Sequence, residues 1–407
     1  MKKLELHWQI LIALLIAILW GLFLTDYVYL IDWMGVLFLR ALKMIIIPLI
    51  FSSIVTGVAN IGDAENLGRL GAKTFSYYLV TSTFAILTGL FFVNILQPGV
   101  GAELGFSKMV EGLSTDKVSF GDTIINIIPT NIFNDFANGN VLPIIFFAIL
   151  LGYFITRIDD KPKIVITDFF NALFDVVMKI TMFIIKFTPL GILGIVAKVV
   201  AEQASDKEAL LAIVGRLGLY MITVILSLGI HFFITLPLLV KFVGRVKPFE
   251  HLKAMRVPLL TAFSTSSSSA TLPLTMEAVE YNSGVSNKVT SFVLPLGATV
   301  NMDGTALYEC VAAMFIAQAY GVELGFTQQI IVVVTALLAS IGAAGIPMAG
   351  LVMISIILSA VGLPLEGIGL ILAVDRILDM LRTTTNVWSD TCGSVIIAKS
   401  EGENLKV

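Results

Sequence analysis

Charged residues are scarce in this chain. Only 14% of its 407 residues are Asp, Glu, Lys or Arg, whereas 57% are hydrophobic, and the mean hydropathy is +0.94. Soluble globular domains carry about 25% charged residues, so this composition excludes an ordinary soluble enzyme. Apolar runs of roughly 20 residues, the length that crosses a bilayer as a helix, recur along the chain. The composition therefore predicts an all-α polytopic membrane protein.

Cysteine and histidine are also nearly absent. Cys310 and Cys392 show no pairing pattern, so neither a disulfide framework nor a cysteine-based metal cluster is expected. The three histidines lie away in sequence from the serines of segment 264–269, so no Ser–His nucleophilic pair is visible. Asp303 and Asp379 lack the GxGD context of intramembrane aspartyl proteases. We therefore expect the protein to be neither an enzyme nor a nucleic-acid-binding protein.

Eight stretches have the length and polarity of membrane spans. Because no small-residue cleavage site follows the first of them, we expect it to be a retained span rather than a signal peptide. Two further apolar segments, 257–280 and 330–362, are interrupted by polar or small residues. The eight stretches are 9–30, 36–58, 75–97, 126–155, 165–200, 209–240, 286–320 and 366–398.

The distribution of lysine and arginine indicates how these segments cross. With the N-terminus in the cytoplasm and both interrupted segments re-entrant, the outer connections hold only Lys108, Lys117 and Lys207, and most other basic connecting residues lie inside. Counting either interrupted segment as a full span spoils this asymmetry. We therefore expect eight transmembrane helices plus two re-entrant helical hairpins in the cell membrane, plasma or inner, with both termini cytoplasmic.

The two interrupted segments are typical of a transport site. The first is broken by the serines of TSSSSATLP and the second by the glycines of ASIGAAGIPMAG. Irregular backbone at membrane depth is tolerated where protein or a water-filled cavity satisfies it, and half-helix N-termini attract anions. Each hairpin precedes a span rich in polar groups, which is the layout of inverted repeats. Serine-rich or GxxxG-type helix packing is the alternative.

Ionisable residues within the spans point to the solute. Asp379, Arg382, Thr383 and Asn386 are three or four residues apart in the last span, so they share one helix face. One anion, one cation and two neutral hydrogen-bonding groups match a zwitterion that bears an extra carboxylate. Self-pairing of an aspartate such as Asp375 with a neighbouring arginine is the structural alternative, and an ion channel is the functional one.

A second polar group favours cations. Asp303 and Asp390, with Asn301 and Asn386, are hard oxygen ligands without cysteine or histidine, which suits alkali cations. Gly304 beside the NMD sequence predicts an unwound stretch whose carbonyls can turn toward an ion.

Long motifs in these regions resemble the dicarboxylate/amino acid:cation symporter family, which includes the glutamate and aspartate transporters. The resemblance runs almost end to end and is closest to the sodium-coupled acidic amino acid branch. The motifs are LKMIIIPLIF at 42–51, PTNIFNDFANGNVLP at 129–143, TSSSSATLP at 265–273, LPLGATVNMDGTALY at 294–308, ASIGAAGIPMAG at 339–350 and RTTTNVWSD at 382–390.

This resemblance implies a homotrimer in which a static scaffold holds a transport domain that moves like an elevator. Residues 1–74 and 99–205 would be scaffold, and residues 75–98 and 206–407 would be transport domain. The resemblance also implies that Arg382 binds the side-chain carboxylate of glutamate or aspartate and that Asp379 binds its amino group. The rest of the implied substrate set is Ser267, Ser268, Thr305, Gly350, Thr383 and Asn386.

The same resemblance implies three sites for co-transported sodium ions. The first set is Gly297, Asn301, Asn386 and Asp390. The second uses backbone carbonyls of Thr299, Ser340, Ile341 and Ala343. The third set is Tyr78, Thr81, Ser82, Asn301 and Asp303.

Three positions distinguish branches of the family. Ser266 matches the animal transporters, whereas archaeal aspartate carriers have arginine there. Met380 stands where the animal transporters have an arginine, and Arg376 is the nearest substitute. Glu309 matches a glutamate that animal members are thought to protonate, so we expect it to couple a proton to transport; a structural hydrogen bond is the alternative. A proton- or sodium-coupled C4-dicarboxylate symporter is the alternative function.

Overall fold

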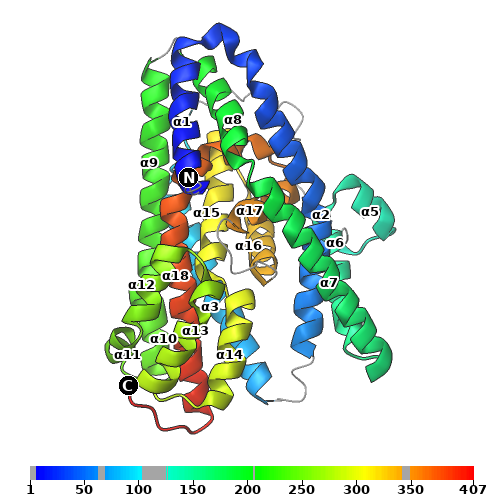
Figure 1. Cartoon of the computed structure of the whole chain (residues 1–407), viewed down its shortest axis with the longest axis vertical. Coiled ribbons are helices and arrows are strands. Elements are labelled where there is room, and N and C mark those ends of the chain that lie inside the picture. Colours follow the sequence, from blue (N-terminus) through cyan, green and yellow to red (C-terminus); the bar gives the residue numbers. More distant parts are fainter. Residues whose placement is uncertain (1–5, 63–68, 103–124, 126, 205–206, 342–348) are drawn as a thin grey trace, which may run out of the picture.

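The computed structural model describes residues 6–62, 69–102, 125, 127–204, 207–341 and 349–407 (Figure 1). Within these residues every regular element is a helix and no strand occurs. The expectation of an all-helical protein is thereby confirmed, and the number of spans and hairpins stays a prediction.

Several helices have the length and composition of membrane spans. Three apolar stretches in the described residues qualify: Asp32–Ala59, Arg69–Leu96 and Leu211–Phe242. A fourth results if α7 (Asp160–Ile185) and α8 (Thr188–Glu202), which are bent by 51°, count as one span. Many large apolar side chains on these helices face outward, as expected of surfaces that lie against lipid. The first stretch belongs to α2 (Asp32–Gly62) and the second is α3 (Arg69–Leu96).

The predicted continuous span 126–155 is wrong, because the chain breaks in its middle. A short helix, α5 (Ile132–Asn138), begins where the Asn131 side chain accepts hydrogen bonds from two backbone N–H groups. It ends at Gly139, whose φ of 76° is readily adopted only by glycine. The next helix, α6 (Val141–Ile155), follows directly.

Two other breaks agree with the sequence. Segment 257–280 forms α12 (Arg256–Thr265) and α13 (Ser268–Glu277), separated at Ser266, which has a φ of 53°. Span 286–320 forms α14 (Asn287–Val300) and α15 (Asp303–Ala319). The unwound stretch predicted beside Gly304 is confirmed at residues 301–302.

The second interrupted segment contains α16 (Phe326–Ile341) and α17 (Ala349–Ala360), which pack against each other. Residues 342–348 between them lie outside the described part. The segment predicted as the last span forms the long helix α18 (Ile368–Ser400). The remaining elements are α1 (Leu6–Phe23), η1 (Thr25–Leu30), α9 (Lys207–Ile230), the π-helical turn η4 (His231–Thr235), α10 (Leu236–Phe242), α11 (Pro248–Ala254), the π-helical turn η5 (Ala278–Asn282), η6 (Leu365–Gly367) and α18 (Ile368–Ser400).

The helices pack in two neighbourhoods. One consists of α1, α2, α6, α7 and α8, and the other is built around α15 and α18, which contact α3, α9, α12, α13 and α14. In Figure 1 the lower half of α18 is surrounded by α12, α13 and α14. Nearly every residue of α15 is buried, as expected of the central helix of a bundle. Most of the polar residues predicted to form the site, which lie on α3, α15 and α18, are therefore buried in the second neighbourhood.

The C-terminal residues fold back onto this bundle. Glu401 accepts ion pairs from Arg69 and Lys73 at the start of α3, at 2.7 and 2.6 Å. The Lys406 N–H donates to the Ser283 carbonyl at 2.9 Å. Residues 401–407, here called the C-terminal strap, thus join the start of α3 to the turn before α14.

Candidate functional site

A buried acid–base cluster lies on α18. The Arg382 Nε donates to Asp379 Oδ1 at 2.9 Å, and Nη2 lies 2.8 Å from the same oxygen. On the other side Nη1 lies 3.3 Å from Asp375 Oδ1. Each of these residues is at most 3% exposed. Asp375 therefore does pair with Arg382, one of the alternatives that the spacing left open, and Asp379 pairs with it as well.

Two other helices complete the surroundings of the guanidinium. The ring of Tyr308 on α15 lies 4.4 Å from its Cζ, in a cation–π arrangement, and the Tyr308 hydroxyl donates to Asp375 at 2.7 Å. A Cβ on Gly350 would lie 2.5 Å from Nη1, so α17 passes directly over the arginine. Neither Nη1 nor Nη2 makes a well-formed hydrogen bond with a described residue. Both nitrogens can therefore still donate to a carboxylate from a ligand.

Asn386 and Thr305 hold the start of α15 against α18. The Asn386 Oδ1 accepts from the N–H groups of Gly304 and Thr305 at 2.7 and 3.3 Å, and its Nδ2 donates to the Thr305 hydroxyl at 3.0 Å. The side chain thus satisfies N–H groups that a helix start leaves without partners. A Cβ on Gly304 would lie 2.5 Å from the Arg382 carbonyl, so this approach requires glycine.

The predicted hairpin serines lie beside the same helix. Ser267 is the N-cap of α13, and its Oγ accepts a hydrogen bond from the Ala270 N–H at 3.2 Å. Ser268 is the first residue of the helix. Both are buried, as is Thr383 on α18, and α13 packs against α18. The predicted substrate residues therefore come from four helices: α15 and α17 contact Arg382 of α18, and α13 packs against α18.

A second buried cluster surrounds Asp303, at the start of α15. The hydroxyls of Ser82 and Thr81 donate to its Oδ1 at 2.6 and 3.3 Å. Its Oδ2 accepts from the Ser389 hydroxyl at 2.6 Å and lies 3.1 Å from the His231 Nε2. Asp303 and His231 have no exposed side-chain surface. Oxygens from α3, α15 and α18 thus converge on one carboxylate.

Asn301 connects this cluster to Asp390. Its Nδ2 donates to Asp390 Oδ1 at 2.8 Å, and its Oδ1 lies 3.5 Å from the Thr81 hydroxyl. A Cβ on Gly297 would lie 2.4 Å from Asp390 Oδ1 and 2.7 Å from the Tyr78 hydroxyl, so only glycine permits this approach. The structure therefore brings together most of the first and third predicted sodium sets.

Other predicted ligands have hydrogen-bond partners outside their predicted sets or lie apart from these clusters. Asn386, assigned to the first set, is bonded to α15 instead of Asp390. Tyr78 donates to the Val293 carbonyl at 2.6 Å. In the second set, the Thr299 side chain is exposed, Ser340 is buried and bonds to its own helix, and Ile341 ends α16. Ala343 of this set lies outside the described residues, so this set stays a prediction.

Sequence reasoning missed His231, Ser389 and the role of Tyr308. His231 opens the π-helical turn η4, a kind of distortion that is frequent at functional sites. The sequence around His231 does not indicate its contact with Asp303, because the two residues are 72 positions apart. Ser389 precedes Asp390 directly, and its position beside a predicted ligand was a signal that could have been used.

Glu309 is buried in α15 without a partner. It has no exposed surface, and neither carboxylate oxygen has a hydrogen-bond partner among the described residues. Arg376, the nearest substitute for the arginine of the animal transporters, is 31% exposed and lies 3.9 Å from Asp379 Oδ2. A carboxylate in such surroundings is far more costly than the neutral acid.

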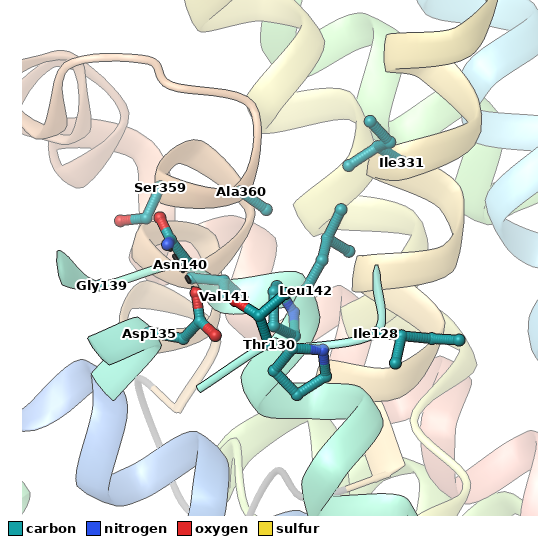
Figure 2. Close-up of a pocket in the computed structure, with 12 residues that line it drawn as sticks. Ile128, Thr130, Asp135, Gly139, Asn140, Val141, Leu142, Ile331, Ser359 and Ala360 are labelled. Carbon is teal, nitrogen blue, oxygen red and sulfur yellow. Dashed lines mark hydrogen bonds between the residues drawn. The ribbon is translucent and has the colours of Figure 1, made fainter. Parts of the chain in front are cut away.

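A cavity of about 470 Å³ lies away from these clusters. Figure 2 shows Asp135 and Asn140, joined by a 2.7 Å hydrogen bond, on one side of it and Ile331 on the other. Residues of α5 and α6 line it together with Ile331 of α16 and Ser359 of α17. None of the predicted site residues lines it.

Exposed apolar helices around buried charged clusters, one within α18 and one at the start of α15, are the features of a polytopic membrane transporter. Residues 6–400 match the sequence model of the sodium:dicarboxylate symporter family. The chain therefore belongs to the sodium:dicarboxylate symporter family.

Individual relatives agree with this assignment. The human protein named excitatory amino acid transporter 3 is 40% identical, over 91% of this chain and 79% of its own. A proton/sodium-glutamate symport protein of Geobacillus stearothermophilus is 36% identical over 99% and 96% of the two chains. The proton/glutamate-aspartate symporter of Escherichia coli K12 is 34% identical over 98% and 93%.

Proposed function

We propose that this protein is a secondary active symporter that carries L-glutamate or L-aspartate together with sodium ions. The observation that carries the proposal is the buried Arg382, whose terminal nitrogens retain unused donors between α15, α17 and α18. An acidic amino acid offers a carboxylate for these donors and an ammonium group for a neighbouring aspartate. The names of the relatives support the same substrate class.

Each member of the acid–base cluster receives a role. Arg382 binds the side-chain carboxylate in a bidentate manner, and Asp379 binds the ammonium group when the substrate loosens the present ion pair. The helix starts at α13 and α15 favour the second carboxylate. The first hairpin contributes Ser267 and Ser268, the second contributes Gly350, and Thr305, Thr383 and Asn386 supply further hydrogen bonds.

Sodium ions are carried at the oxygen-rich clusters. One ion binds among Tyr78, Thr81, Ser82, Asn301 and Asp303, and one among Gly297, Asn301, Asn386 and Asp390. The third binds to carbonyls at Thr299, Ser340, Ile341 and Ala343. Two hydrogen bonds support the first two of these sites, since the Ser82 hydroxyl donates to Asp303 and Asn301 donates to Asp390. A bound cation would take the place of these donors beside the carboxylates.

Transport follows an elevator movement in a homotrimer. Residues 75–98 and 206–407 move as one body past a scaffold of residues 1–74 and 99–205, within the cell membrane and with cytoplasmic termini. The separate packing neighbourhoods and the cavity between α6 and α17 support such a movement, because that cavity lies where the moving body would slide past the scaffold.

Glu309 couples a proton to the cycle. It is protonated while substrate is bound and gives up the proton on the empty return. The absence of any partner for its oxygens in the described residues supports this role over a structural hydrogen bond.

Uptake into proteoliposomes tests the proposal. Labelled aspartate and glutamate should accumulate under an imposed sodium gradient, with succinate and uncharged amino acids as competitors. The alternative is a symporter of C4-dicarboxylates, and the family's name refers to dicarboxylates. Succinate that competes as well as aspartate would establish that alternative and overturn the proposal.

A further inference from the structure

A second cavity, of about 280 Å³, lies between α2, α8 and the turn η6. It contains none of the residues assigned to the acid–base cluster or the sodium sets. Its distinguishing feature is charge, because Asp32, Arg40, Lys43, Lys198 and Glu366 all line it.

Close packing of two helices creates this cavity. A Cβ on Gly194 would lie 2.5 Å from the Gly35 nitrogen, so α2 and α8 touch at their backbones there. Lys198 follows Gly194 by one turn on α8, and Arg40 and Lys43 follow Gly35 on α2. The long basic side chains therefore reach into the space beside the crossing.

The charges in this cavity are not compensated by one another. None of the five side chains forms an ion pair or side-chain hydrogen bond with any residue that the structure describes. Lys43 is 11 residues from the start of α2 (from position 32 to position 43), which is roughly 16 Å along a helix. Cations at that depth in an apolar span are costly unless they are paired or solvated.

The net charge of these five side chains indicates which ligand would fit the cavity. Three cations against two carboxylates leave one net positive charge, which a single phosphodiester would neutralise. Arg40 and Lys43 are exposed, and their neighbours Val36, Leu37 and Met44 form an apolar outer surface on α2. A ligand that enters here comes from the bilayer with its apolar part along α2.

We propose that this cavity binds the headgroup of a singly charged anionic phospholipid, such as phosphatidylglycerol. The phosphate lies among Arg40, Lys43 and Lys198, and the headgroup hydroxyls donate to Asp32 and Glu366. The acyl chains lie against the apolar face of α2. The inference does not depend on the identity of the transported solute.

Native mass spectrometry of the purified protein with added lipid tests the site. Phosphatidylglycerol should remain bound where phosphatidylcholine does not, and Arg40→Gln/Lys43→Gln should weaken its retention roughly tenfold or more. Asp32→Asn/Glu366→Gln should strengthen retention, because it leaves more positive charge in the cavity. The matched control is Lys179→Gln/Lys186→Gln, which removes two exposed cations from membrane helices outside the cavity.

Three outcomes would overturn the proposal. Equal loss in both double glutamine variants would indicate general attraction to basic helices. Equal retention of the two lipids would exclude recognition of charge. Full competition by soluble glycerol 3-phosphate would indicate a site for a free anion rather than for a lipid. If the Arg40/Lys43 variant fails to fold, Lys198→Gln alone tests the same cavity.

Discussion

Arg382 lies between two carboxylates and under an aromatic ring, so its charge is compensated even without a ligand. Arg382→Ala removes the buried cation that pairs with Asp375 and Asp379, whereas Arg376 remains 3.9 Å from Asp379 Oδ2. We expect binding of aspartate and glutamate to be lost, and binding of small neutral amino acids to appear. Calorimetric titration in sodium-rich buffer measures both, with Arg256→Ala, an exposed arginine at the start of α12, as control.

Gly297 offers a test of the cation cluster that leaves all ligand side chains in place. A methyl group there would lie 2.4 Å from Asp390 Oδ1 and 2.7 Å from the Tyr78 hydroxyl. Gly297→Ala should raise the sodium concentration for half-maximal uptake by about tenfold, which corresponds to roughly 1.4 kcal/mol. The control is Gly215→Ala in α9, where no atom lies within 4 Å of the added carbon. An unchanged sodium dependence would contradict the assignment of the first sodium set.

Glu309 provides the test for the proton. Glu309→Gln keeps the shape of the side chain but cannot exchange a proton. We expect the variant to retain sodium-dependent exchange of substrate and to lose the dependence of net uptake on an imposed pH gradient. Normal net uptake by the variant, together with a wild type that ignores the gradient, would show that Glu309 is structural.

At the scale of helices, the sequence predicted breaks where polar or small residues interrupt an apolar run. Asn301 and Ser266 lie at such places, and both breaks were found. The break at Gly139 was missed although Asn138 and Asn140 flank the glycine and interrupt the apolar run there as well, so the same signal could have predicted it. The His231–Asp303 contact was missed for another reason, since pairing across 72 residues depends on how helices pack.

The C-terminal strap has a measurable dependence on pH. Hydrogen bonds and ion pairs from Arg69 and Lys73 lower the pKa of Glu401 from its ordinary value of 4.5 to about 2. A lowered pKa means that the strap contributes stability above the ordinary value and loses it as the pH falls from 4.5 through about 2. Glu401→Gln should therefore lower the thermal unfolding midpoint at pH 7, with a smaller difference from wild type at pH 3.

The control for the strap is Glu250→Gln, because Glu250 forms an exposed pair with Lys247 at 2.9 Å. Exposed pairs of this kind contribute little. A loss of stability equal to that of Glu401→Gln would mean that the strap has no special role.

At the scale of the whole molecule, the cavity of Figure 2 tests the elevator movement. Thr130 precedes α5 and Ser359 lies near the end of α17, and both line this cavity. A flexible cross-linker between Thr130→Cys and Ser359→Cys should stop uptake, whereas either single variant treated alike should remain active. The native cysteines Cys310 and Cys392 are fully buried and should not react. Continued transport after complete cross-linking would contradict the movement.

The bond between Ser82 and Asp303 joins residues that are 221 positions apart in the chain. Such contacts form late, because the entropy of closing the intervening loop must be overcome before they stabilise anything. Before α15 packs against α3, the Thr81 hydroxyl can donate a hydrogen bond to the carbonyl of Tyr77 in its own helix. Polar side chains on α3, which precedes α15 in the chain, therefore have hydrogen-bond partners even before α15 is in place. Substitutions that weaken the packing of α15 should accordingly appear as poor maturation of the protein before they appear as slow transport.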